Sequence, residues 1–395
     1  MNNDTSLHRS LAARPASSTG GIYFHIPFCK RRCVYCDFFS STDSGKKAAY
    51  VQALCRELEL RQDYLNGQPV QTVYFGGGTP SQLSADDFGK LFDTLYRLFP
   101  ISPEAEITLE ANPDDLTEDY LSSLKPFPFN RLSMGIQTFH DDTLRLLHRR
   151  HTAAQAVEAF HRCRDAGIGN LSIDLMYGLP GETIKRWEAD LRQALELAPE
   201  HISAYHLIYE EGTALWRLRD QHQVAEADEE LSLTFYRHLV QRLKENGYEH
   251  YEISNFCRPG RFSRHNSSYW DGTPYLGCGA AAHSYNGMAR QANVASIDGY
   301  IAGIRQGSPD VETEPLDLAT RYNDCIVTAL RTCWGVSLPL LTERFGKKLA
   351  DYCLRMARPH LQRGTLELLA DHLKLTERGV FVSDDILSDL LWVEA

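Results

Sequence analysis

The most informative stretch of the chain runs Tyr23-Phe24-His25-Ile26-Pro27-Phe28-Cys29-Lys30-Arg31-Arg32-Cys33-Val34-Tyr35-Cys36-Asp37-Phe38. Its three cysteines are separated by three and then by two residues, so their thiolates can converge on one soft metal centre. Structural zinc and cubane iron–sulfur clusters both usually take four protein ligands. No fourth Cys or His follows in register, because Phe38 stands there. A cubane cluster on Cys29, Cys33 and Cys36 would therefore leave one iron open for chemistry.

A simpler explanation is that these three cysteines are ordinary buried residues, since free cysteine is common in protein cores. The intervening Lys30, Arg31 and Arg32 argue against it, because such residues belong on a solvated loop and lower the pKa of nearby thiols. We therefore favour a metal cluster, and we keep a zinc-stabilised interaction protein without redox chemistry as an alternative.

Short apolar runs alternate with amphipathic segments over most of the chain. The expected strands cover residues 21–28, 70–75, 105–109, 131–136, 171–175 and 202–208, and the expected helices include 48–65, 86–99, 153–166 and 187–197. Such alternation predicts a parallel sheet with crossover helices. A closed barrel of this type needs eight units. We therefore expect an α/β fold built on an incomplete (β/α)6 barrel.

The chain divides into three expected parts. Residues 1–20 are expected to be a disordered leader, and residues 21–305 to form the partial barrel with an extension. Residues 308–315 look like a linker. Residues 316–395 are expected to form a winged-helix-like α+β module, with helices at 318–331, 338–344, 348–363 and 384–391 and short strands at 366–369, 373–375 and 380–382.

Composition excludes several classes of protein. The 395 residues include 41 Lys and Arg against 52 Asp and Glu, and the net charge of −11 opposes general binding to nucleic acid. No apolar run approaches the roughly 18 to 20 residues that span a bilayer. The ten cysteines are mostly scattered, which does not suggest a secreted disulfide scaffold. We expect a cytoplasmic protein.

Cys-x3-Cys-x2-Cys after a first strand resembles the signature of radical S-adenosylmethionine (SAM) proteins. The resemblance implies a [4Fe–4S] cluster on Cys29, Cys33 and Cys36. It also implies that the amino and carboxylate groups of SAM bind the open iron, and that reductive cleavage of SAM can yield a 5′-deoxyadenosyl radical.

Polar or glycine-rich segments follow the later expected strands, where the loops of a barrel build its active site. Each is weak alone, because polar residues at strand ends commonly cap helices or face water. Together they resemble the oxygen-independent coproporphyrinogen III oxidase-like branch of the superfamily. The resemblance implies a SAM site lined by Tyr23, Gly77, Gly78, Thr79, Glu110, Gln137, Arg149 and Asp174. Arg150 is an alternative to Arg149, because His148 replaces the glycine that usually precedes this arginine.

Two departures separate the sequence from the true oxidases of this branch. The oxidases carry a fourth cysteine where Phe38 stands, and a long N-terminal segment where only 28 residues precede Cys29. The related haem chaperones instead show Asp-Phe after the third cysteine and a His-Asn-x-x-Tyr-Trp motif. Both are found here, as Asp37-Phe38 and His265-Asn266-Ser267-Ser268-Tyr269-Trp270.

The second motif could contact haem, because imidazole is a common iron ligand and a porphyrin needs aromatic walls. His265, Tyr269 and Trp270 are therefore the candidate haem residues, although a histidine that braces a loop beside packed aromatics would show the same pattern. Cys278 or His283 could compete as the iron ligand, and the glycines and alanines around them could equally serve tight packing.

The resemblance thus implies a haem chaperone that holds a [4Fe–4S] cluster, binds SAM and delivers haem to respiratory or other haem proteins. We expect no coproporphyrinogen oxidase activity, a possible homodimer, and at most peripheral contact with the inner membrane face. The enzymatic alternative is oxygen-independent coproporphyrinogen III dehydrogenase, which decarboxylates propionate groups through the adenosyl radical.

Overall fold

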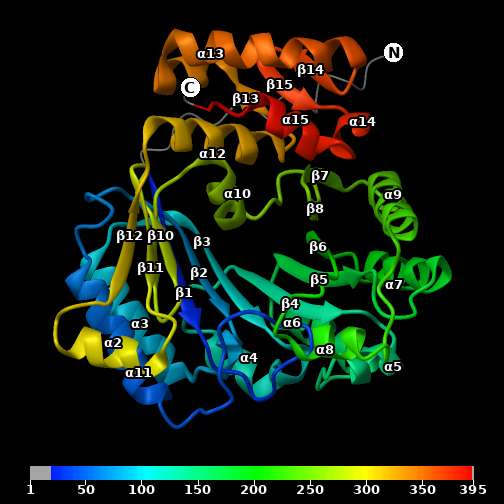
Figure 1. The fold of residues 1–395 in the computed structure, drawn as a ribbon. Helices are drawn as coiled ribbons and strands as arrows, with labels where there is room; N and C mark the ends of the chain where they lie inside the picture. Colours follow the sequence, from blue (N-terminus) through cyan, green and yellow to red (C-terminus); the bar gives the residue numbers. More distant parts are fainter. Residues whose placement is uncertain (1–18, 394–395) are drawn as a thin grey trace.

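The computed structural model describes residues 19–393. Residues 1–18 of the leader expected over residues 1–20 therefore lie outside the described residues. The core is a sheet in which six parallel strands follow one another in chain order (Figure 1). These strands are β1 (Gly20–Ile26), β2 (Val70–Gly77), β3 (Ile101–Ala111), β4 (Arg131–Gln137), β5 (Leu171–Tyr177) and β6 (His201–His206). The expected α/β fold with an incomplete barrel is confirmed.

Crossover helices cover the outer face of this sheet (Figure 1). They are α2 (Lys47–Leu60), α3 (Ala85–Leu98), α4 (Glu118–Leu124), α5 (Asp141–Leu146), α6 (Ala153–Asp165) and α7 (Ile184–Leu197). Ser84 and Thr152 begin α3 and α6 with capping boxes, in which the side chain accepts a hydrogen bond from the backbone three residues on. The strands and helices bury continuous apolar clusters between them. This packing holds the carboxyl ends of the strands in fixed positions along one edge of the sheet.

The sheet continues beyond the six parallel strands on both sides. After α8 (Ala214–Asp220) and α9 (Glu229–Glu245), strand β8 (Asn255–Cys257) extends it antiparallel to β6, and β7 (Glu249–Glu252) pairs antiparallel with β8 at the edge. After α10 (Arg264–Asp271), strand β9 (Tyr275–Cys278) returns parallel to β1. The edge is completed by β10 (His283–Tyr285), β11 (Ala289–Asn293) and β12 (Val311–Pro315), with α11 (Ile297–Arg305) between the last two. The prediction of a linker over residues 308–315 is therefore wrong for residues 311–315, because they form β12, whose backbone pairs with β11.

The C-terminal part contains α12 (Leu318–Leu330), α13 (Leu338–Arg363) and α15 (Ser383–Leu390) around a small sheet of β13 (Val336–Ser337), β15 (His372–Leu375) and β14 (Leu366–Leu369). Gly346, at φ 79°, interrupts α13 and separates the two helices expected there. The strand expected at residues 380–382 is wrong, because α14 (Glu377–Val380) occupies its start. The winged-helix comparison stays a prediction. No helix within residues 19–393 is long and apolar enough to cross a membrane.

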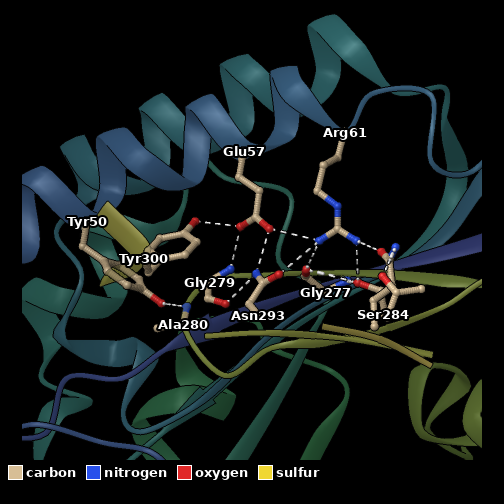
Figure 2. Close-up of polar contacts among 11 residues, drawn as sticks. Tyr50, Glu57, Arg61, Gly277, Gly279, Ala280, Ser284, Asn293 and Tyr300 are labelled. Atoms are coloured by element: carbon tan, nitrogen blue, oxygen red, sulfur yellow. Dashed lines mark hydrogen bonds and ion pairs between the residues drawn. The ribbon is translucent and has the colours of Figure 1, made fainter. Parts of the chain in front are cut away.

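A buried ion pair on α2 fastens the extension to the barrel (Figure 2). Glu57 is fully buried and accepts hydrogen bonds from Arg61 at 3.0 Å, the backbone of Gly279 at 2.8 Å, Asn293 at 2.8 Å and Tyr300 at 2.7 Å. Arg61 in turn donates to the carbonyl of Gly277 and to three side chains of β10 and β11. Because both charges are partnered on every side, the pair holds β9, β10 and β11 in one position.

Candidate functional site

A cavity of about 460 Å³ opens at the carboxyl ends of the parallel strands. It is lined by most of the residues that the sequence assigned to the cluster and SAM, namely Cys29, Cys33, Cys36, Gly77, Gly78, Thr79, Glu110, Gln137, Arg149 and Asp174. Tyr23 does not line it, since the Tyr23 hydroxyl lies 3.1 Å from Nδ1 of His25, and its ring stacks on Tyr74. Residues from the carboxyl-terminal parts of strands β2 to β5, and from loops that follow β1, β2 and β4, therefore meet in one space.

The three cysteines form one wall of this cavity, and all three are half-buried. The Thr79 hydroxyl donates to Cys29 Sγ at 3.3 Å, and the Arg149 guanidinium donates to Cys33 Sγ at 3.4 Å. Burial raises the pKa of Cys29, and it raises that of Cys36 to about 11. Within residues 19–393 no three His, Cys, Asp or Glu side chains surround a point where a single ion would sit. The thiols thus face a shared space in which Thr79 and Arg149 already supply donors to sulfur.

Arg149, and not Arg150, is the arginine that reaches the cavity. Its Nη2 donates to Asn112 Oδ1 at 2.6 Å and to the carbonyl of Gly135, while its Nε is buried without a partner among the described residues. Arg150 turns away and pairs with Asp114 and Asp115. His148 takes φ 60°, the left-handed conformation that glycine adopts more easily. The backbone therefore makes the turn that aims Arg149 with a histidine at a position where a glycine would be less strained.

The glycines of the second loop let its backbone pack closely against β1 and the start of the cysteine loop. A Cβ at Gly78 would lie 2.9 Å from the carbonyl oxygen of Ile26 and 3.1 Å from Cys29 Sγ. Gly77 has φ 106°, and a Cβ there would lie 2.6 Å from the imidazole of His25. Any larger residue would push the cysteine loop outward. Together with the unpartnered Nε of Arg149 and the sulfur donors, this close approach fits an iron–sulfur cluster on the three thiols.

Two carboxyl groups face the cavity from β3 and β5. Glu110 accepts hydrogen bonds from the hydroxyl of Tyr74 at 2.6 Å and from the backbone of Gly77 at 3.2 Å, and burial raises its pKa to about 7. Asp174 accepts from the Ser133 hydroxyl at 3.2 Å, and burial raises its pKa to about 6. Partly desolvated carboxylates of this kind gain most from a cationic or hydroxyl-bearing ligand.

Gln137 ends β4 in a strained conformation. Its φ is 74°, and the register between β4 and β5 shifts between Gly135 and Gln137. Bulges commonly turn a side chain toward a functional site, and Gln137 indeed lines the cavity.

The His-Asn-x-x-Tyr-Trp motif lies elsewhere, on α10 near the amino ends of β1 and β2. His265 is 1% exposed, and both ring nitrogens are occupied, Nδ1 by the Thr72 hydroxyl and Nε2 by the Tyr269 hydroxyl, each at 2.8 Å. Burial lowers the His265 pKa to about 3. The motif histidine thus braces α10 against the barrel in this structure, while Tyr269 remains 37% exposed. Its role as a haem ligand stays a prediction.

Sequence reasoning missed two residues of this region. Asn112 lines the cavity and holds Arg149, and its signal was its place two residues beyond Glu110 at the end of β3. Tyr74 reaches Glu110 from the interior, and its signal was the two-residue alternation with Thr72 along β2.

Comparison with known proteins agrees with this geometry. The chain matches the family model for the radical SAM superfamily over residues 23–194 and that for the HemN C-terminal domain over residues 316–382. Its fold resembles the solved structure of the coproporphyrinogen III oxidase HemN from Escherichia coli, described there as a radical SAM enzyme, with a TM-score of 0.81 over 98% of this chain and 93% of that one at 22% identity. The fold is that of a radical SAM protein.

Curated relatives narrow this class. The chain is 35% identical to the haem chaperone HemW of Bacillus subtilis over 93% of this chain and 98% of that protein. It is 34% identical to the HemW of Mycobacterium tuberculosis over 94% of each chain, and 31% identical to the mitochondrial radical S-adenosyl methionine domain-containing protein 1 of Bos taurus over 96% of this chain and 91% of that protein. The chain belongs to the HemW family of radical SAM proteins.

Proposed function

We propose that this protein is a haem chaperone that holds a [4Fe–4S] cluster on Cys29, Cys33 and Cys36 and binds SAM in the adjoining cavity. The observation that carries the cluster and SAM assignment is the convergence of three thiols, the glycine loop and Arg149 on one space. Membership of the HemW family supports haem as the cargo. A bound cluster would supply an iron that no protein side chain ligates.

The surrounding residues have separate roles in this proposal. Thr79 and Arg149 would donate to the cluster thiolates, as they donate to Cys29 Sγ and Cys33 Sγ here, and the methionyl end of SAM would lie beside the backbone of Gly77 and Gly78. Glu110 would accept a hydrogen bond from the amino group of SAM, and Gln137 and Asp174 would bind its ribose hydroxyls. These three side chains already line the cavity.

Haem would be delivered to respiratory or other haem proteins from the cytoplasm, with at most peripheral contact at the inner membrane face and with a homodimer as a possible form. The cargo would contact the exposed side of the motif helix α10, through Tyr269 and Trp270. His265 would act there through its hydrogen bond to Tyr269, or as an iron ligand once that bond is broken.

The test uses anaerobically reconstituted protein. Iron and acid-labile sulfide are quantified first, and the protein is then incubated with haem and, separately, with coproporphyrinogen III, SAM and a reductant. We expect about four irons and four sulfides per chain, saturable haem binding and no protoporphyrinogen. Formation of protoporphyrinogen at a catalytic rate would contradict the chaperone proposal and favour the dehydrogenase. A colourless protein that contains zinc and no sulfide would contradict both and favour a zinc-stabilised interaction protein.

A further inference from the structure

A second cavity, of about 510 Å³, lies between α10 and the C-terminal helices α12 and α13. Figure 1 shows α10 directly beneath α12, on the side of the barrel away from the cysteine loop. Tyr275, which lines this cavity, pairs with Gly21 at the amino end of β1, whereas the cysteine loop follows the carboxyl end of that strand. The two cavities are therefore at opposite ends of the parallel strands.

Flat aromatic side chains form much of the wall of this second cavity. Tyr269 and Trp270 come from the motif helix, Tyr275 and Tyr285 come from β9 and β10, and Phe345 comes from α13. The rings of Tyr269 and Tyr275 pack edge to face, with centroids 4.7 Å apart. Such walls suit a planar, largely apolar ligand, because aromatic rings bury large areas at defined angles.

Three arginines line the cavity together with Asp271 and Asp324, and they differ in their partners. Arg290 pairs with Asp324 and Glu314, and the guanidinium of Arg321 lies on the sulfur of Met288. Arg344 lines the same cavity, and among residues 19–393 no hydrogen bond or ion pair involves its side chain. Its Nη1 lies within 3.5 Å of where a Cβ of Gly272 would be, so the guanidinium reaches the end of the motif helix.

We propose that this cavity is the haem site, with the macrocycle between the aromatic side chains and a propionate on Arg344. This inference rests on the proposed function and adds to it the place of the cargo and a residue outside the sequence motif. Haem combines a flat apolar ring with two carboxylates on one edge. The cavity matches both properties, since arginine forms paired hydrogen bonds with a carboxylate. Cys325 adds a thiol to the wall, so ring binding has to be separated from iron ligation.

The test measures binding of three probes to the full chain with its cluster reconstituted, by fluorescence quenching and absorption. The probes are haem, metal-free protoporphyrin IX, and protoporphyrin IX dimethyl ester, which lacks the carboxylates. We expect Arg344→Ala to weaken haem and protoporphyrin IX about tenfold or more, because a hydrogen bond to a charged group is lost. The dimethyl ester should bind the wild type and Arg344→Ala equally.

Two further variants guard against misfolding and unspecific charge effects. Arg358→Ala removes another exposed arginine of α13 that does not line the cavity, and it should bind all three probes like the wild type. Thr328→Trp should fill the cavity from α12 and weaken all three probes, with an unchanged iron–sulfur spectrum as the check on folding.

The outcomes separate the site from the function. If the wild type binds haem and neither Arg344→Ala nor Thr328→Trp changes that binding, the haem site lies elsewhere. The chaperone proposal would then remain valid. A wild type that binds neither haem nor protoporphyrin IX would overturn the chaperone proposal and this site with it.

Discussion

Tyr74 donates a hydrogen bond of 2.6 Å to Glu110, deep in the interior of the partial barrel. The ring of the same tyrosine stacks on His265 with centroids 4.9 Å apart, and His265 in turn holds the hydroxyl of Tyr269. On the other side, Glu110 accepts from the backbone of Gly77 in the glycine loop. One column of contacts therefore joins the motif helix to the loop beside the cysteines.

Tyr74→Phe tests the end of this column at Glu110. Because the Glu110 pKa is raised to about 7 by burial, the carboxylate is ionised only above that pH and protonates as the pH falls through it. If it accepts a hydrogen bond from the amino group of SAM, SAM affinity rises as the pH rises through 7, because the ionised carboxylate is the better acceptor. Loss of the Tyr74 hydroxyl removes a hydrogen bond that lowers this pKa, so the midpoint should move to higher pH. Calorimetric titration of reconstituted protein between pH 6 and 9 measures it. Tyr96→Phe, at an exposed site, is the control, and identical profiles for all three proteins would contradict the role of Glu110.

Arg149→Gln should weaken retention of the iron–sulfur cluster. The variant removes the donor to Cys33 Sγ and leaves Asn112 Oδ1 and the carbonyl of Gly135 without the donor they have here. Loss of such supporting contacts typically costs about 10- to 100-fold in metal affinity. Iron remaining after timed exposure to a chelator is the measurement. Arg145→Gln, at an exposed position of α5, should retain iron like the wild type, and equal losses from both variants would argue against a specific contact.

His265→Ala separates the two roles open to the motif histidine. An iron ligand would be needed for haem and not for metal-free protoporphyrin IX, whereas a residue that positions Tyr269 would affect both. From the hydrogen bonds at both ring nitrogens we expect both probes to bind more weakly. We also expect the free energy of unfolding to fall by about 3 kcal/mol or more, because the substitution deletes a buried ring. Weakened haem binding with unchanged porphyrin binding would establish iron ligation instead.

Glu57→Ala should be among the most destabilising substitutions in the chain. It leaves the Arg61 guanidinium buried beside donors from Gly279, Asn293 and Tyr300 without their acceptor. Breaking a buried pair in this way typically costs about 3–5 kcal/mol. Glu59→Ala removes a more exposed carboxylate on the same helix, which pairs with Arg56 and Arg97, and should cost no more than about 1 kcal/mol. Chemical denaturation compares the two, and similar losses would show that the network adds nothing beyond a surface pair.

Much of the fold could be predicted from periodicity and turn residues. The six strands of the barrel were expected within a few residues, because apolar β-rich runs and amphipathic helices alternate cleanly over residues 20–206. The edge strand β12 was missed, because Val311–Pro315 is nearly all exposed and has the composition of a linker. Its pairing with β11 rests mainly on backbone hydrogen bonds, and the side-chain contacts Arg290–Glu314 and Gln291–Thr313 are between polar residues that give no strand pattern.

The candidate site divides in the same way. Cys29, Cys33, Cys36 and the residues at strand ends could be placed, because parallel strands bring their carboxyl ends to one edge. The surroundings of His265 could not, because its partners Thr72 and Tyr74 lie almost two hundred residues earlier, as the separation of 193 from Thr72 shows. Nothing local marks Arg344, whose side chain meets the motif helix only after the C-terminal part has packed.

The pairing of β12 with β11 decides where the chain can be shortened. Truncation after residue 305 would remove the edge strand β12 from the large sheet. The backbone of β11 could then pair with other molecules, which is a common route to aggregation. Truncation just after Pro315 would keep β12 paired with β11. A soluble fragment that lacks the last helices is therefore best ended there.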